Sequence, residues 1–115
     1  MLKRRRISRM SSFISQQPNG RYCRFSSVVD GVTHVNMTYE DYVDLLIENG
    51  RNKESAIETA NEIMDRRLRP FIEVLAGMST SNATIGQLIM EIRLMGYEGD
   101  LTSYIKGWKE EINFD

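Results

Sequence analysis

Apolar residues recur at the 3.6-residue spacing of amphipathic helices through most of the chain after residue 38. Four helices are predicted on this basis, over about residues 39–49, 53–76, 84–95 and 101–112. The second apolar stripe runs through Pro70, which has no backbone N–H and clashes with the preceding turn. We therefore expect a kink or a break there. About four residues join the last two helices, which is typical of a helical hairpin or a helix-turn-helix.

Capping residues support these boundaries. Thr38 followed by Asp41 matches a capping-box pattern before the first helix, and Thr84 followed by Gln87 matches one before the third. Gly96 comes directly after the third apolar stripe, where a left-handed C-cap favours glycine. The starts of these two helices are accordingly the best-marked boundaries in the chain.

A different pattern precedes the helices. Valines flank the dipeptide Asp30-Gly31, a strong signal for a β-hairpin with a type I′ turn, so a hairpin is predicted over residues 21–37. A two-residue loop would place Ser27 opposite His34. Because a lone two-stranded ribbon is marginal in water, we expect it to lean on the helices. The predicted fold class is α+β, with an N-terminal basic arm and a β-hairpin packed on three to four α-helices.

Length and composition indicate one domain. A chain of 115 residues can bury a core of its own, so residues 21–115 are predicted to form a single globular domain, and residues 1–20 a flexible basic arm. No apolar run reaches the roughly 20 residues of a membrane span, so no membrane partner is expected. Cys23 is the sole cysteine, which excludes an internal disulfide and favours a cytoplasmic setting.

Charge is segregated along the chain. Residues 1–28 carry seven bases and no acid, whereas residues 29–115 carry eight bases and all 16 acids. A basic segment joined to an acidic body suggests binding partners rather than chemistry.

Catalytic and metal-binding patterns are weak. Ser27, His34 and Asp30 could be gathered by the hairpin, but Asp30 sits in the turn rather than behind His34, so a cross-strand polar pair is favoured. Cys23 is interpreted as a small packed residue. One histidine and one cysteine cannot build a closed zinc site, and no glycine-rich phosphate loop follows a strand. The sequence thus predicts no catalytic, metal or cofactor site and a non-enzymatic protein.

Acidic residues are the leading candidates for partner binding. They are Glu40, Asp41, Asp44 and Glu48 in the first predicted helix, followed by Glu98, Asp100, Glu110 and Glu111. An acidic surface can compete for a nucleic-acid-binding groove, because such grooves are lined with Lys and Arg. The net charge of −8 over residues 29–115 is weaker than a dedicated DNA mimic would carry.

Basic residues support an alternative, a DNA-binding regulator or nucleoprotein accessory. The candidates are Lys3, Arg4, Arg5, Arg6, Arg9, Arg66, Arg67 and Arg69. They could bind phosphates without reading sequence. The run from Ile85 to Trp108 resembles the helix-turn-helix of some transposases and repressors. However, the net charge of −3 over residues 83–115 is wrong for DNA and favours a packing hairpin. A homodimer through Trp108 is a further alternative.

One stretch carries a family resemblance. Residues 18–26 (Pro-Asn-Gly-Arg-Tyr-Cys-Arg-Phe-Ser), Val29-Asp30, Thr33-His34 and residues 36–42 (Asn-Met-Thr-Tyr-Glu-Asp-Tyr) are similar to small uncharacterised proteins encoded by bacteriophages and prophages. The resemblance covers residues 18–75, including Arg69-Pro70-Phe71, and brings no active site with it.

The resemblance implies a phage accessory protein acting in the cytoplasm of a bacterial host cell. Such proteins often act by binding, as inhibitors of host defence nucleases (anti-CRISPR proteins among them) or as small regulators. The expected function is therefore inhibition of a host protein through the acidic helical surface, with a nucleic-acid-handling defence complex as the expected class of target.

Overall fold

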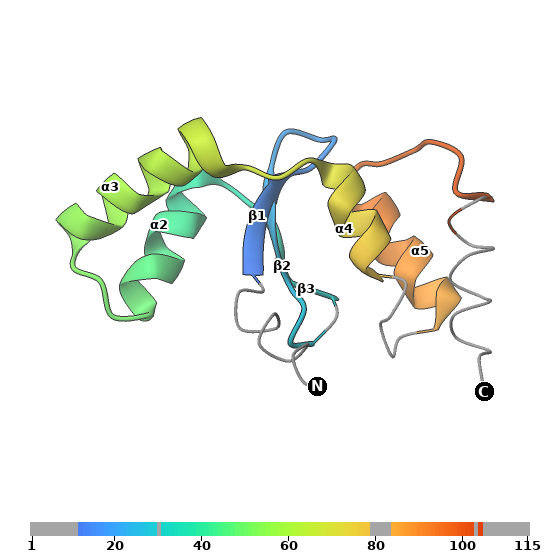
Figure 1. Cartoon of the computed structure of the whole chain (residues 1–115), viewed down its shortest axis with the longest axis horizontal. Coiled ribbons are helices and arrows are strands. Elements are labelled where there is room, and N and C mark those ends of the chain that lie inside the picture. Colours follow the sequence, from blue (N-terminus) through green and yellow to red (C-terminus); the bar gives the residue numbers. More distant parts are fainter. Residues whose placement is uncertain (1–11, 30, 79–83, 103, 105–115) are drawn as a thin grey trace, which may run out of the picture.

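The computed structural model describes residues 12–29, 31–78, 84–102 and 104 of the 115-residue chain. A three-stranded antiparallel sheet in the order β1-β2-β3 lies at its centre (Figure 1). Its strands are β1 (Ser12–Gln16), β2 (Tyr22–Ser26) and β3 (Gly31–Met37). Helices cover both faces of this sheet, so the α+β fold class is confirmed.

The predicted arm over residues 1–20 is wrong at its C-terminal end, because β1 lies inside it. β1 pairs with β2 along its whole length. Phe13 lies opposite Phe25, and their stacked rings have centroids 5.2 Å apart. The residues interpreted as the end of an arm form the β1–β2 turn, in which the Gly20 N–H donates to the Gln17 carbonyl at 2.9 Å. The sheet therefore has three strands rather than the two of a hairpin. Residues 1–11 lie outside the described residues.

The predicted hairpin exists, but its register is different. Phe25 pairs with Val32 and Arg24 with His34, and β-bulges interrupt the ladder on either side of Arg24. The connection starts after Ser26, so Ser27 is part of it and does not face His34. The observed register puts Phe25 and Val32 on the same rung of the ladder, and both pack in the same hydrophobic core.

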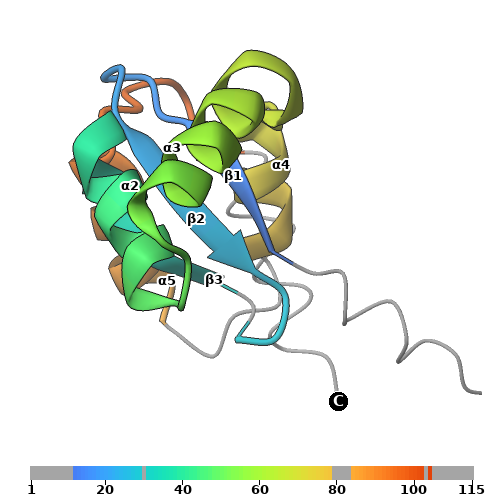
Figure 2. The same ribbon diagram turned by 90° about the vertical axis from the view of Figure 1, so that its left-hand side faces the viewer.

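Two helical layers sandwich the sheet (Figures 1 and 2). One layer holds α2 (Tyr39–Glu48), α3 (Lys53–Glu62) and the π-helical turn η1 (Ile63–Arg67). The other holds α4 (Phe71–Gly77) and α5 (Ile85–Leu94).

The helix predicted over residues 53–76 is broken rather than kinked. Its α-helical part ends at Glu62, η1 follows, and Leu68 and Pro70 are extended. Pro70 cannot continue a helix and disfavours helical geometry in the residue before it. The extended segment crosses the edge of β1, where the Arg69 N–H donates to the Ile14 carbonyl at 2.9 Å. The break thus carries the chain from one helical layer to the other.

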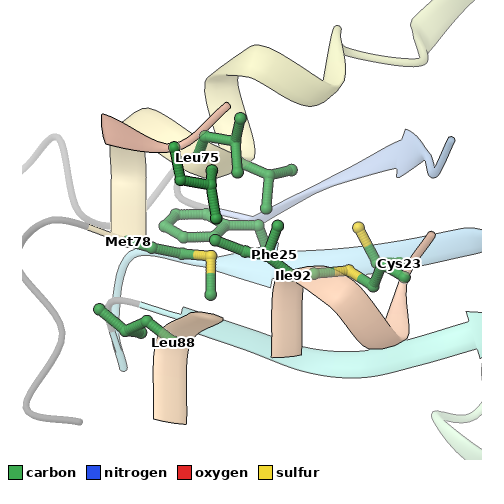
Figure 3. Close-up of a cluster of buried hydrophobic side chains, with 9 residues drawn as sticks. Cys23, Phe25, Leu75, Met78, Leu88 and Ile92 are labelled. Atoms are coloured by element: carbon green, nitrogen blue, oxygen red, sulfur yellow. The ribbon is translucent and has the colours of Figure 1, made fainter. Parts of the chain in front are cut away.

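Each layer has its own core, and the core on the α2–α3 face is the smaller of the two. On the α4–α5 face the buried cluster contains Cys23 and Phe25 from β2 with the apolar faces of both helices (Figure 3). On the α2–α3 face the buried residues are Ile14, Met37, Tyr42, Val43, Ala56 and Ala60.

Both predicted capping boxes are confirmed. Thr38 and Asp41 exchange two hydrogen bonds of 3.0 Å at the start of α2, and Thr84 and Gln87 form the same motif at α5. Gly96 has a φ of 96°, as the left-handed C-cap requires. Most of the helix predicted over residues 101–112 lies outside the described residues.

Candidate functional site

The acidic residues predicted on the first helix border a groove beside the edge strand β3. This acidic groove has a volume of about 420 Å³. Its lining residues come from β3 (His34, Val35, Met37) and from α2 (Asp41, Asp44, Leu45, Glu48). Three of the four acids predicted on this helix are therefore gathered at one place.

Packing determines which way α2 presents its acids. Tyr42 and Val43 are buried against the sheet, so Asp44 and Glu48 point away from the core and are exposed. Glu40 is also exposed, four residues before Asp44, but does not line the groove. The helix thus carries an acidic stripe at i, i+4 and i+8.

Local contacts keep the acidic groove negatively charged. Within the described ranges the ion pairs are Glu62–Arg67 and Glu73–Arg69, so none of the acids of α2 forms an ion pair there, although the charge of Arg21 contributes to lowering the pKa of Asp41. The Thr38 backbone N–H donates to the Asp41 carboxylate and, together with the Thr38 hydroxyl, holds the pKa of Asp41 below its usual value. Asp41 is therefore ionised at neutral pH and serves both the helix cap and the groove.

The second group of predicted acids is not part of this groove. Glu98 and Asp100 are exposed in the turn after α5, and the Asp100 carboxylate accepts the Thr102 N–H at 3.0 Å. That bond and the Thr102 hydroxyl lower the pKa of Asp100. Glu110 and Glu111 lie outside the described residues.

Two of the predicted bases border a second cavity, beside β1. This arginine cavity has a volume of about 430 Å³, and its charged lining residues are Arg24, Arg67 and Arg69. The remaining lining residues are Ser12, Phe13, Ile14, Tyr42 and Ile63. Arg66 is exposed and does not line it. The predicted bases Lys3, Arg4, Arg5, Arg6 and Arg9 lie outside the described residues.

Sequence reasoning missed Arg24, Phe13 and Tyr42 as members of this cavity. Arg67 is the last residue of η1 and Arg69 follows the extended Leu68, and the spacing of two between these arginines is visible in the sequence. Arg24 comes from another strand, and only the tertiary fold brings it to the other two. No local pattern marks it.

The groups that the sequence analysis weighed for catalysis are Cys23, Ser27, His34 and Asp30, of which Asp30 lies outside the described residues. Cys23 is fully buried, and desolvation by burial raises its thiol pKa to about 12. His34 is exposed, and its Nδ1 lies 2.9 Å from the Thr33 hydroxyl rather than near Ser27. In the part of the chain that is described, no three His, Cys, Asp or Glu side chains are grouped to hold a metal ion.

Arg93, at the end of α5, forms hydrogen bonds within the turn that follows this helix. The Arg93 guanidinium donates to the Tyr97 carbonyl at 2.8 Å and to the Gly99 carbonyl at 3.1 Å. Arg93 therefore holds the turn after α5 in place. Trp108, the residue expected at a dimer face, lies outside the described residues, whereas Met90 and Leu94 on α5 are exposed.

Comparisons with family models, with curated proteins and with solved structures find no match. Among the described helices, none is long and apolar enough to cross a membrane.

Proposed function

We propose that this protein is a non-enzymatic binding protein that inhibits a partner protein by docking its acidic groove on a basic surface. The observation that supports this most directly is the grouping of Asp41, Asp44 and Glu48 along one groove beside the sheet edge β3. Acids that form no ion pair within the described ranges attract a surface rich in Lys and Arg and speed its association.

The target class follows from charge and from the resemblance of residues 18–75 to phage accessory proteins. Surfaces that bind nucleic acid are lined with Lys and Arg, and an acidic groove can occupy them in place of the phosphates. A host protein that handles nucleic acid, such as a defence nuclease complex in the bacterial cytoplasm, is the proposed target.

The acidic stripe of α2 costs stability, which fits a role in binding. Like charges four residues apart destabilise a helix by about 0.2–0.5 kcal/mol per pair, and Glu40, Asp44 and Glu48 form two such pairs. Glu48 also lies in the last turn, where the helix dipole disfavours an acid. α2 contains no base that would offset these terms.

Helix α3 supplies a matched control. Glu54, Glu58 and Glu62 have the same spacing, but they do not line the acidic groove, and Glu62 is paired with Arg67. The substitutions Asp44→Lys and Glu58→Lys therefore change the same charge at the centre of the same type of stripe. Each is expected to stabilise its helix, by about 0.5–1 kcal/mol.

The test is a comparison of partner capture by three tagged full-length proteins, the wild type, Asp44→Lys and Glu58→Lys. Each is incubated with bacterial lysate treated with nuclease, and the captured proteins are eluted with increasing salt. We expect a discrete host protein on the wild type and on Glu58→Lys, and at least tenfold less on Asp44→Lys, about 1.4 kcal/mol. The purified host protein should then lose its own activity when the wild type is added.

Equal capture by Asp44→Lys and Glu58→Lys would contradict the role of the groove. Disappearance of every captured protein after nuclease treatment would contradict direct protein binding and would favour the DNA-binding alternative.

A further inference from the structure

The arginine cavity has the features of an anion-binding site on the opposite edge of the sheet from the acidic groove. We propose that this cavity binds a phosphate ester, held by the guanidinium groups of Arg24, Arg67 and Arg69. This inference is independent of the proposed function, because it concerns other residues and a ligand of opposite charge.

The backbone places two of the three arginines rigidly. η1 ends at Arg67, and the extended Leu68 turns into the smaller core while its neighbours Arg67 and Arg69 point to the cavity. The Arg69 backbone is fixed by its hydrogen bond to the Ile14 carbonyl, and its guanidinium lies 5.3 Å from the centre of the Phe13 ring. π-helical turns of this kind occur frequently at functional sites.

The charges of the cavity are incompletely balanced. Three arginines line it and no acid does. Glu62 pairs with Arg67 at 3.3 Å and Glu73 with Arg69 at 2.5 Å, and all four side chains are at least one third exposed, so these pairs are weak.

Arg24 is the member of the cavity that points most directly to a ligand. It is half-buried, it donates to the Thr33 hydroxyl at 3.0 Å, and it has no carboxylate partner within the described ranges. A guanidinium has five N–H donors, so all three arginines keep donors for a bound anion.

Phosphate is the anion that fits best. It carries up to two charges and several acceptor oxygens, and arginine forks bind it with two parallel hydrogen bonds. The volume of about 430 Å³ exceeds that of a phosphate group and falls in the range of small-molecule sites. Ile14, Tyr42 and Ile63 supply apolar wall for the organic part of the ester.

The phosphate ester has two sources, a free nucleotide or a nucleic-acid strand. Ser12 lines the cavity, and the chain that precedes it carries Arg9 and residues 3–6, all basic. A nucleic-acid strand bound in the cavity could also contact these basic side chains, whereas a mononucleotide would need the cavity alone.

The test is calorimetric titration of the full chain with three probes in 50 mM NaCl: adenosine 5′-monophosphate, a 5′-phosphorylated ten-nucleotide oligothymidine, and succinate. The variants are Arg67→Gln and Arg24→Gln, with Arg66→Gln as the matched control, since Arg66 neighbours Arg67 but lies outside the cavity. Circular dichroism verifies that each variant is folded. We expect Arg67→Gln and Arg24→Gln to weaken binding of the phosphorylated probes at least tenfold and Arg66→Gln less than about twofold.

A fourth variant, Glu62→Gln, should shift binding in the other direction. It removes the carboxylate that competes for Arg67, so we expect the phosphorylated probes to bind up to about fivefold more tightly. A purely structural role for Arg67 would not produce this gain.

Deleting residues 1–9 separates the two sources. A strand is identified as the ligand if the oligonucleotide binds the full chain more tightly than the mononucleotide does and the deletion removes that advantage. A free nucleotide is identified if the mononucleotide binds at least as tightly as the oligonucleotide and the deletion weakens neither. Succinate binding as tight as that of the phosphorylated probes would overturn the phosphate assignment. The proposed site would be overturned if none of the probes bound, or if Arg66→Gln and Arg67→Gln lost the same amount of affinity for the phosphorylated probes.

Discussion

The two clefts beside α2 have nearly equal volumes, about 420 and 430 Å³, but opposite charge. In the acidic groove the charges come from one helix, whereas in the arginine cavity they come from β2, from η1 and from the extended segment after it. α2 contributes to both walls, with Tyr42 on one side and Asp44 on the other. Local sequence can place charges on a single helix, but only the assembled fold can bring arginines from three segments together.

The largest effect is expected from truncating Tyr42, because α2 forms part of the wall of both clefts. Tyr42 is buried in the smaller core, so Tyr42→Ala should lower the free energy of unfolding by about 3–5 kcal/mol, as for other large aromatic truncations. Binding at both clefts should weaken together. Urea denaturation measures the loss, and Tyr42→Phe, which keeps the ring, should lose much less. A loss below 1 kcal/mol for Tyr42→Ala would show that α2 does not depend on this contact.

Charge substitutions should separate the two clefts. Asp44→Lys is expected to weaken binding of a basic partner about tenfold, and Arg67→Gln to weaken binding of a phosphate ester by the same factor, about 1.4 kcal/mol. Because the two residues line different clefts, the double variant should show the two losses independently. Titration of both ligands into the single and double variants measures this. A coupling of more than about 0.5 kcal/mol would mean that the clefts act as one site.

The start of α2 can be weakened without touching the lining of either cleft. Thr38→Ala removes the hydroxyl that accepts the Asp41 N–H, and such N-cap losses cost about 1 kcal/mol. Thermal unfolding measures the change, and Thr38→Ser, which keeps the hydroxyl, is the control. Equal melting temperatures for Thr38→Ala and the wild type would show that the cap adds no stability.

Protonation of the same cap should have the smallest effect. Since its pKa is lowered in the folded state, Asp41 stabilises the protein above its unfolded-state pKa, and this contribution disappears as the pH falls through the folded-state pKa. The melting temperature of Asp41→Asn should be below that of the wild type at pH 7, and the difference should shrink in acid. A difference that stayed constant from pH 7 to acid would contradict the assignment.

The comparison of the clefts also explains how far the sequence could be interpreted. Helix starts were predicted correctly where a capping box lies beside an apolar stripe, as at Thr38 and Thr84, because both signals are local. The acids of α2 are predicted on one helix for the same reason, whereas the groove that three of them form with β3 is not.

The errors involve strand pairing, which the pattern of a single segment does not show. The sequence does not mark β1 as a strand, because five residues are too few to show a clear alternation of apolar and polar positions. Its pairing partner, β2, lies beyond a turn. The register of β2 and β3 depends on bulges that let Phe25 reach the core, which no turn dipeptide encodes. Arg24 joins the arginine cavity only because β2 lies beside β1.

Cys23 gives this molecule a built-in reporter. Its sulfur is sealed between β2 and the α4–α5 layer, and its thiol pKa is raised to about 12, so a reagent that attacks the thiolate must wait for that layer to open. The rate of thiol labelling in native conditions therefore measures the opening equilibrium of the α4–α5 layer, in the manner of hydrogen exchange at a single position. Both clefts lie beside the α2–α3 layer. A cleft ligand that slows the labelling of Cys23 would therefore show that binding on one face of the sheet stabilises the helices on the other face.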